Sequence, residues 1–86
     1  MKVYCAFRSY CDDNDELFAI FFERDDAVNK LIDFAICDGY VDNTNENEVR
    51  EHLDDRSCVL FSKDGTIVDV FEPFTMGYVV EEWEVE

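Results

Sequence analysis

The chain has 86 residues, with 22 Asp or Glu against seven Lys or Arg, and its formal net charge is −15. Domains of this size seldom divide, so residues 1–86 are expected to form a single compact acidic domain. The 48% hydrophobic and 15% aromatic content is too high for a disordered acidic tail. The charge excludes direct binding to nucleic acid or to an anionic membrane, because both need a basic face. A core this small is marginal, which leaves stabilisation by a partner or by homodimerisation open.

The sequence also predicts where the protein works. No apolar run at the N-terminus is long enough for a signal peptide, and none approaches the ~18 residues of a membrane span. We therefore expect a cytoplasmic protein, in the host cell cytosol if a phage encodes it. In reducing cytosol the four cysteines are expected to be free thiols. We expect Cys5, Cys37 and Cys58 to pack as small hydrophobic residues and Cys11 to be the most exposed.

Two strands are predicted near the N-terminus. Residues Val3–Arg8 alternate in the manner of a half-buried strand. Residues Leu17–Phe22 form a continuous apolar run, which predicts a central strand covered on both faces. Because the acidic turn Cys11–Glu16 between them is short, the two strands are expected to form a hairpin.

A long helix is predicted over Arg24–Asp38. Its apolar residues recur at helical spacing, and Gly39 lies where a C-terminal cap belongs. Asp25 and Asp26 fall in the first turn, where carboxylates favour the positive end of the helix dipole. The residues of the apolar stripe are Ala27, Val28, Leu31, Ile32, Phe34 and Ala35.

A shorter helix is predicted over Glu46–Asp55. Its apolar stripe is only Val49 and Leu53, so packing must decide whether it forms. Asn45 and Glu48 have the spacing of a capping box, although Asn is not its usual first residue.

The C-terminal half predicts three further strands. Ser57–Ser62 and Thr66–Glu72 flank an Asp-Gly pair that ends at Gly65, a strong hairpin signal. Pro73 ends the second of these strands, and Tyr78–Glu86 is the last. The order strand–strand–helix–helix–strand–strand–strand predicts an α+β fold. We expect an antiparallel sheet of about five strands with one long and one short helix packed on one face.

Residues typical of catalysis or metal binding are not arranged in a recognisable pattern. Calcium-loop spacings that start at Asp12 or Asp42 lack the required Gly and Glu. The cysteines are too far apart for a zinc pair, and the one imidazole, His52, is expected at the rim of the short helix. Three glycines offer no phosphate-binding loop. The sequence therefore predicts no enzyme, no cofactor and no metal site.

Two sets of carboxylates have regular spacing on predicted rigid elements. Regular carboxylates can stand in for backbone phosphates, which follow each DNA strand at ~3.4 Å of axis. A basic cleft built for nucleic acid would be attracted to them and blocked by them. Solvated outer faces, or an edge strand that repels aggregation, are the competing interpretations. The sets are Asp26 and Asp33, with Asn29 between them, on the long helix, and Glu82, Glu84 and Glu86 on the last strand.

Several aromatic residues lie in or beside predicted loops, outside the apolar stripes. Packing beneath the loops is the ordinary explanation for such residues. Aromatics with acidic neighbours are also common in the centre of protein interfaces. The residues are Tyr10, Tyr40, Phe74 and Tyr78.

Three short segments carry a resemblance. Lys2–Tyr4 (KVY), Phe22–Ala27 (FERDDA) and Val80–Glu86 (VEEWEVE) resemble small acidic proteins of phages and mobile elements. Those proteins begin strand–strand–helix and end on an acidic strand with one Trp. In size and charge the chain is also similar to anti-CRISPR and anti-restriction inhibitors. Several of those occupy the DNA-binding or PAM-reading surface of a nuclease complex as acidic mimics.

We therefore hypothesise a phage-type, anti-CRISPR-like inhibitor. Its partner would be a basic nucleic-acid-binding protein, such as a CRISPR effector or nuclease, whose DNA- or RNA-binding surface it blocks by charge mimicry. One alternative is an accessory or regulatory module that binds a protein through exposed aromatics, with the acids serving solubility. A third hypothesis is a thiol-based or metal-linked role for the cysteines. The predicted partner-binding residues are Asp25, Asp26, Asp33, Glu81, Glu82, Glu84 and Glu86, with Trp83 as core or anchor.

Overall fold

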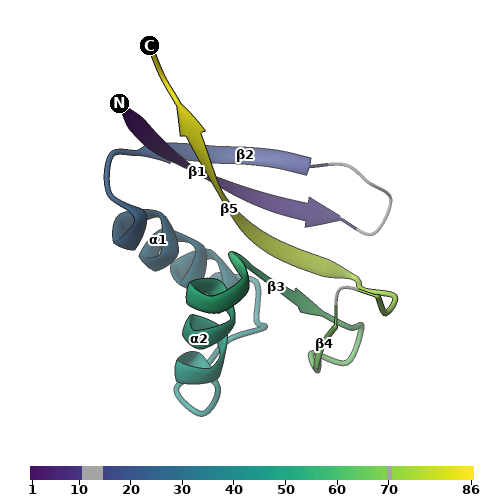
Figure 1. The fold of residues 1–86 in the computed structure, drawn as a ribbon. Helices are drawn as coiled ribbons and strands as arrows, with labels where there is room; N and C mark the ends of the chain where they lie inside the picture. The colour runs from purple at the N-terminus through teal and green to yellow at the C-terminus, as the bar shows by residue number, and fades with distance from the viewer. Residues whose placement is uncertain (11–14, 70) are drawn as a thin grey trace.

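The computed structural model describes residues 1–10, 15–69 and 71–86. They form one antiparallel sheet in the strand order β2-β1-β5-β3-β4, with both helices on one face (Figure 1). The α+β class, the element order and the one-sided helical layer are confirmed. The elements are β1 (Lys2–Tyr10), β2 (Asp15–Phe21), α1 (Arg24–Cys37), α2 (Glu46–Arg56), β3 (Cys58–Phe61), β4 (Ile67–Val68) and β5 (Met76–Glu84).

Strands β1 and β5 form the centre of the sheet. They pair antiparallel over their full lengths, from Lys2 opposite Glu84 to Tyr10 opposite Met76. On its other edge β5 pairs with β3, but this pairing stops at Val79 opposite Cys58. The last residues of β5 therefore extend beyond Cys58, the first residue of β3. The acidic C-terminal strand β5 is thus central in the sheet at its start, whereas its last residues have no partner in β3.

Strand β2 is an edge strand, so the prediction of a central strand covered on both faces is wrong. It pairs with β1, and the hairpin between these strands is confirmed. Leu17 and Ile20 are 45% and 53% exposed, respectively. The pairing register shifts between Ala6 and Phe7, where β2 carries one extra residue. The unbroken apolar run reflects a strand whose two faces are both apolar, and such a run does not report strand order.

The core lies between the helices and the sheet. Helix α1 contributes the predicted stripe, although its Phe34 is half-buried. Each large aliphatic side chain that is fully removed from water contributes about 1.5–3 kcal/mol before opposing terms. The principal core residues are Ala6, Val28, Leu31, Ile32, Ala35, Val49, Leu53, Val59, Phe61, Tyr78 and Val80.

The end of α1 follows the glycine-capped pattern predicted from the sequence. Gly39 has φ +87°, a left-handed conformation that costs a residue with a Cβ. The turn lets the Gly39 N–H donate to the Ile36 carbonyl at 3.1 Å and the Tyr40 N–H donate to the Ala35 carbonyl at 2.9 Å. These bonds satisfy carbonyls that the helix end would leave open and turn the chain toward α2.

The capping box predicted for α2 does not form. Asn45 occupies the N-cap position but makes no side-chain capping bond. Its amide oxygen instead accepts the Asp42 N–H at 2.8 Å, and its amide nitrogen donates to the Tyr40 carbonyl at 3.0 Å. The side chain therefore fixes the loop between the helices, because partners in that loop engage both ends of its amide.

The β3–β4 hairpin is confirmed, but β4 is much shorter than the predicted strand Thr66–Glu72. Gly65 has φ +87°, as the tight turn requires. The Asp64 carboxylate accepts hydrogen bonds from the Ser62 hydroxyl and from the Thr66 N–H at 3.1 Å. These bonds lower the pKa of Asp64 to about 2, so the turn keeps its ionised carboxylate in mild acid.

Replacing Gly39 tests the cap. No heavy atom lies within 4 Å of a Cβ built at this position, so Gly39→Ala meets no clash and acts through backbone conformation alone. We expect Gly39→Ala to lower the free energy of unfolding by about 1–2 kcal/mol in urea titration. Gly39→Asn is the matched control and should lose less, because Asn tolerates the left-handed region. Equal losses for the two variants would contradict the conformational explanation.

Candidate functional site

The three acids predicted on the long helix are exposed on α1. Asp25 and Asp26 lie in its first turn, and Asp33 lies about two turns further along. Among the described residues, no ion pair reaches any of them. Between Asp26 and Asp33, the Asn29 side chain accepts a hydrogen bond from Arg50 of α2 at 2.8 Å. The helix therefore presents carboxylates to solvent beside its contact with α2.

The acids predicted on the last strand do not form one row. Glu82 and Glu84 pair with Tyr4 and Lys2 and share the helix-bearing side of the sheet. Glu81 points to the opposite side, and Glu86 lies beyond the end of β5. The structure therefore brings Glu82 and Glu84 together and separates Glu81 from them.

Neighbouring groups partly neutralise the β5 acids. The Lys2 ammonium lies 3.6 Å from the Glu82 carboxylate, and the N-terminal ammonium lies 3.6 Å from Glu84. The Tyr4 hydroxyl also donates to Glu82 at 3.3 Å. These exposed contacts contribute little stability, but they lower the local charge. The last strand itself carries no Lys or Arg. The groups on β1 that neutralise its acids could not be predicted from the sequence without the β1–β5 register.

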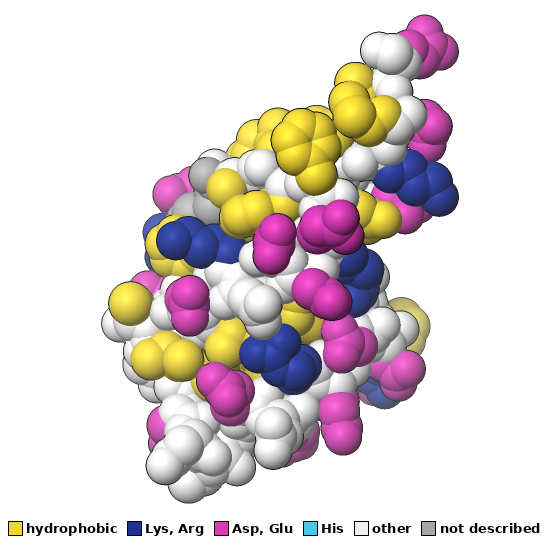
Figure 2. All heavy atoms as spheres, turned by 90° about the vertical axis from the view of Figure 1, so that its left-hand side faces the viewer, with side chains coloured by type: hydrophobic (Ala, Val, Ile, Leu, Met, Phe, Trp, Pro, Cys, Tyr) yellow, Lys and Arg dark blue, Asp and Glu magenta, His cyan; other side chains and the backbone are white. Residues whose placement is uncertain are grey.

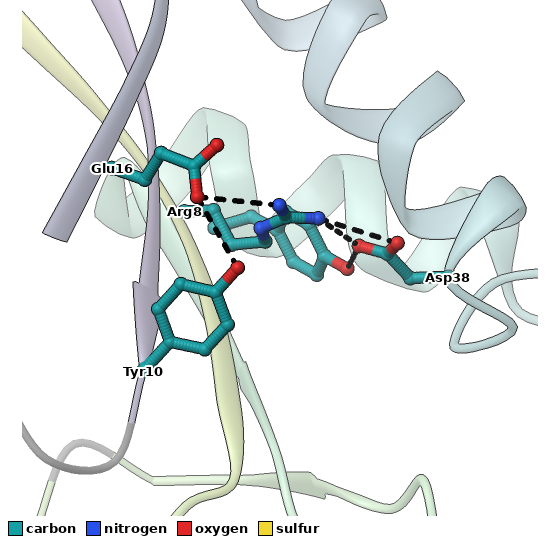
Figure 3. A network of polar contacts seen from close by, with 5 residues as sticks. Arg8, Tyr10, Glu16 and Asp38 are labelled. Atoms are coloured by element: carbon teal, nitrogen blue, oxygen red, sulfur yellow. Dashed lines mark hydrogen bonds and ion pairs between the residues drawn. The ribbon is translucent and has the colours of Figure 1, made fainter. Parts of the chain in front are cut away.

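Arg8 is turned inward between β1, β2 and the end of α1 (Figure 3). Its side chain is 18% exposed, and its guanidinium lies 3.1 Å from Asp38 and 3.4 Å from Glu16. The Tyr10 hydroxyl donates to the same Glu16 carboxylate at 3.3 Å. Arg8 therefore holds the residue after α1 against the centre of the sheet.

Tyr78 of β5 adds a further hydrogen bond to the Arg8–Asp38 network. Its ring is fully buried, and its hydroxyl donates to the Asp38 carboxylate at 2.6 Å. Burial raises the pKa of Tyr78 far above its usual value, and the hydrogen bond to Asp38 raises it further. Because the phenol stays neutral and donates to a carboxylate that Arg8 also binds, the network has a structural role.

Arg24 makes the corresponding connection at the start of α1. One guanidinium nitrogen donates to the Leu53 carbonyl at 2.6 Å and to the Ser57 hydroxyl at 3.3 Å. The other lies 3.2 Å from Asp54. Arg24 thus fastens α1 to the end of α2. Together with Arg8 it takes two of the seven basic residues into contacts that hold the fold together.

The sheet face opposite the helices carries a second surface, which we call the open face. Its side chains follow from the pairing registers, and none of the described helices covers it (Figure 1). Val3 and Cys5 are shielded by their neighbours, whereas Leu17, Ile20 and Trp83 are 44–53% exposed. The open face comprises Val3, Cys5, Phe7, Ser9, Leu17, Ile20, Cys58, Leu60, Val68, Val79, Glu81 and Trp83.

The open face is apolar in a very acidic protein. Trp83 stacks near Phe7 with ring centroids 6.0 Å apart, and its indole N–H donates to Glu81 at 3.0 Å. Glu81 is the one acid among the described strand side chains of the open face. From the side, hydrophobic side chains gather at the level of the sheet and acids lie mainly at the level of the helices (Figure 2).

The aromatic residues that the sequence singled out divide between core and margin. Tyr78 is fully buried, and Tyr40 packs on Phe61 with centroids 5.1 Å apart. Packing is therefore the correct explanation for these two, although Tyr78 packs in the core from within β5 and only Tyr40 packs from a loop. The large exposed aromatics among the described side chains are instead Phe22, Phe71 and Trp83. The alternation of Trp83 with Val79 was the available signal for the open face.

The described thiols and carboxylates form no metal site. No group of three or more His, Cys, Asp or Glu in residues 1–10, 15–69 and 71–86 is placed to hold a metal ion. Cys5 and Cys58 are shielded free thiols, and burial raises the pKa of each. Cys37 is an exposed free thiol, so the prediction that it packs as a small hydrophobe is wrong: it lies at the last residue of α1, off the buried stripe. Cys11, predicted to be the most exposed, lies outside the described residues.

Two other features carry no binding chemistry of their own. A shallow hollow of about 490 Å³ beside the β3–β4 turn is lined by Ser62, Lys63 and Asp64, whose carboxylate is already engaged within the turn. His52 is half-buried on α2, as expected for a rim position. Neither described helix is long and apolar enough to cross a membrane.

No family model matches the chain, and neither the curated proteins nor the solved structures give a match. The exposed carboxylates of α1 and β5 and the open face are therefore the two surfaces from which a function can be argued.

Removing the Tyr78 hydroxyl tests the buried network. Tyr78→Phe leaves Asp38 without its shortest hydrogen bond, and we expect the free energy of unfolding to fall by about 1.5–3 kcal/mol. Tyr10→Phe is the matched control and should cost less, because its 3.3 Å bond to Glu16 is exposed to water. Urea denaturation measures both variants. A Tyr78→Phe loss no larger than that of Tyr10→Phe would show that the network does not stabilise the fold.

Alkaline titration tests the protonation state of Tyr78. The folded-state pKa lies above the ordinary value of 10.0, so the neutral phenol stabilises the fold fully below pH 10 and loses this effect as the pH rises further. We expect Tyr78 to contribute no tyrosinate absorbance in the ultraviolet while the protein is native. The Tyr78→Phe variant should give the same native amplitude as the wild type. A smaller amplitude in the variant would mean that Tyr78 ionises in the folded protein.

Proposed function

We propose that this chain is an acidic, phage-type inhibitor that resembles anti-CRISPR proteins in its mode of action. It binds a basic nucleic-acid-handling protein, such as a CRISPR effector or nuclease, and blocks the surface that receives DNA or RNA. The observation that carries this proposal is the distribution of charge. Arg8 and Arg24 are drawn into contacts between elements, whereas Asp25, Asp26 and Asp33 have no ion pair among the described residues.

The spacing of these carboxylates supports the proposal. Asp26 and Asp33 are seven residues apart on α1, a rise of about 10.5 Å. Glu82 and Glu84 are two residues apart on β5, a rise of about 6.8 Å. These distances are close to three and two steps of the ~3.4 Å axial repeat of phosphates along a DNA strand. Both pairs sit on regular elements, so they are presented without a large ordering cost on binding.

The first turn of α1 also lies close to the acidic part of β5. Arg24, the first residue of α1, donates to the Ser57 hydroxyl, and the Ser57 carbonyl accepts the Val80 N–H at 2.8 Å. The first turn of α1 is therefore close to Val80, two residues before Glu82. A basic cleft that engages Asp25 and Asp26 would meet Glu82 and Glu84 on the same approach.

A second candidate is an accessory or regulatory module that binds a protein through exposed apolar groups. The exposed Trp83, Leu17 and Ile20 favour it. In that case the acids serve solubility, and binding responds weakly to salt. A charge mimic loses affinity steeply as salt screens its carboxylates.

Neutralising the α1 acids tests the proposed function. The probe is the pool of bacterial proteins that bind immobilised heparin, passed over the immobilised chain. We expect the wild type to retain nucleic-acid-binding proteins at low salt and to release them at high salt or with duplex DNA. The triple variant Asp25→Asn, Asp26→Asn, Asp33→Asn should bind roughly tenfold more weakly, from about 0.5 kcal/mol per charge.

The matched control neutralises three acids of α2, Glu46→Gln, Glu48→Gln and Glu51→Gln, which changes the net charge equally at other positions. Its binding should weaken less. For the β5 pair, Glu82→Gln is preferable to a charge reversal, since the amide oxygen can still accept from Tyr4. Circular dichroism checks that each variant folds. Retention that ignores salt, DNA and the α1 substitutions would contradict charge mimicry and favour the accessory module.

A further inference from the structure

We infer that the open face is the contact surface for a second copy of this chain. A contiguous apolar sheet face of this kind is unusual on a soluble monomer and marks an interaction site. Leu17, Ile20 and Trp83 are each about half exposed on it, around the shielded Val3 and Cys5. An interaction that covers them would remove apolar surface from water, which is the main driving term of association.

The distribution of acids favours an identical partner over a basic one on this face. The chain carries a net charge of −15, yet Glu81 is the one acid among the described strand side chains of the open face. The carboxylates that would attract a basic protein lie on α1 and on the helix-bearing side of β5. When two open faces meet, those carboxylates remain on the outer sides of both copies and stay far apart.

Glu81 lies at the side of the open face, where β5 is no longer paired with β3. The β3–β5 pairing stops at Val79 opposite Cys58, so Glu81 lies beyond the first residue of β3. Its carboxylate accepts the Trp83 indole N–H at 3.0 Å, which fixes it beside the ring. At the rim of the contact it keeps access to water and avoids the cost of burying a charge.

The geometry suits two sheets that stack face to face. Sheets pack about 10 Å apart with their strands rotated by roughly 30°, an angle that arises from their twist. Two copies of one sheet have the same twist. Strand spacing of about 4.8 Å and a rise of about 3.3 Å per residue give the whole five-strand sheet a flat area of roughly 490 Å². This lies below the about 800 Å² per partner of a standard interface, so the dimer forms reversibly with concentration.

Salt distinguishes this contact from binding to a basic protein. Two chains of charge −15 repel one another, and salt screens that repulsion while leaving the apolar contact in place. The dimer therefore tightens as salt is added. Binding of a basic partner through the α1 carboxylates weakens under the same change, so the two associations respond with opposite sign.

Sedimentation velocity of the full chain over a range of concentrations, at low and high salt, tests the proposal. We expect a monomer–dimer equilibrium that shifts toward dimer at high salt. Leu17→Lys and Ile20→Lys place an ammonium on the open face and should raise the dimer dissociation constant about tenfold or more each. Ile36→Lys is the matched control, because Ile36 is 45% exposed on α1, like Leu17 on β2.

The control also removes the effect of net charge. Each Lys substitution lowers the net negative charge by one and weakens the repulsion between two copies equally. If only Leu17→Lys and Ile20→Lys weaken the dimer, the loss therefore comes from the open face. Thermal denaturation confirms that the variants fold. A wild type that stays monomeric at high concentration and high salt overturns the proposal, as does a dimer that Ile36→Lys disrupts equally. Loss of heparin-pool binding on Ile20→Lys in a monomeric chain would assign the open face to the basic partner instead.

Discussion

Two helices cover one face of a five-stranded sheet, and the rest of the molecule follows from this constraint. Helix α1 has 14 residues and α2 has 11, which gives lengths of about 21 Å and 16 Å. Side by side they shield the face that carries Ala6, Tyr78 and Val80. The chain has no second helical layer among its described residues, yet its strands are apolar on both sides. The outer side therefore becomes the open face.

The charges are arranged around this one-sided core. Cations are used mainly where elements meet: Arg8 joins β1 to the residue after α1, and Arg24 joins α1 to the end of α2. Acids occupy the solvent side of the helices and the end of β5. The result is a molecule with an acidic helical side and an apolar sheet side. Each side suits a different contact, one governed by electrostatics and the other by burial of apolar area.

Local patterns in the sequence were sufficient for most of the fold. The helical period of α1, Gly39 and the Asp-Gly turn at Gly65 each encode their structure within a few residues. The place of β2 in the sheet was not predictable in this way, because an apolar run specifies a strand but not its neighbours. Asn45 was misread for a related reason: its spacing fits a capping box, but contacts in the preceding loop engage its side chain instead.

The candidate surfaces were only partly accessible from the sequence. The exposed position of Asp25, Asp26 and Asp33 follows from the helical period, and the structure agrees. The division of Glu81 from Glu82 and Glu84, and the Lys2 ammonium beside Glu82, depend on the pairing of β1 with β5. The open face likewise required the register, since its residues come from all five strands of the sheet.

Trp83 provides the most direct test of the claim that the open face is a contact surface. It is the one tryptophan of the chain, and it lies half exposed on that face. Its fluorescence emission and its quenching by acrylamide should be followed as the protein is concentrated from micromolar to millimolar at high salt. We predict a blue shift and reduced quenching as the indole is covered. Emission and quenching that stay constant would contradict it, because the indole would then remain in water at every concentration.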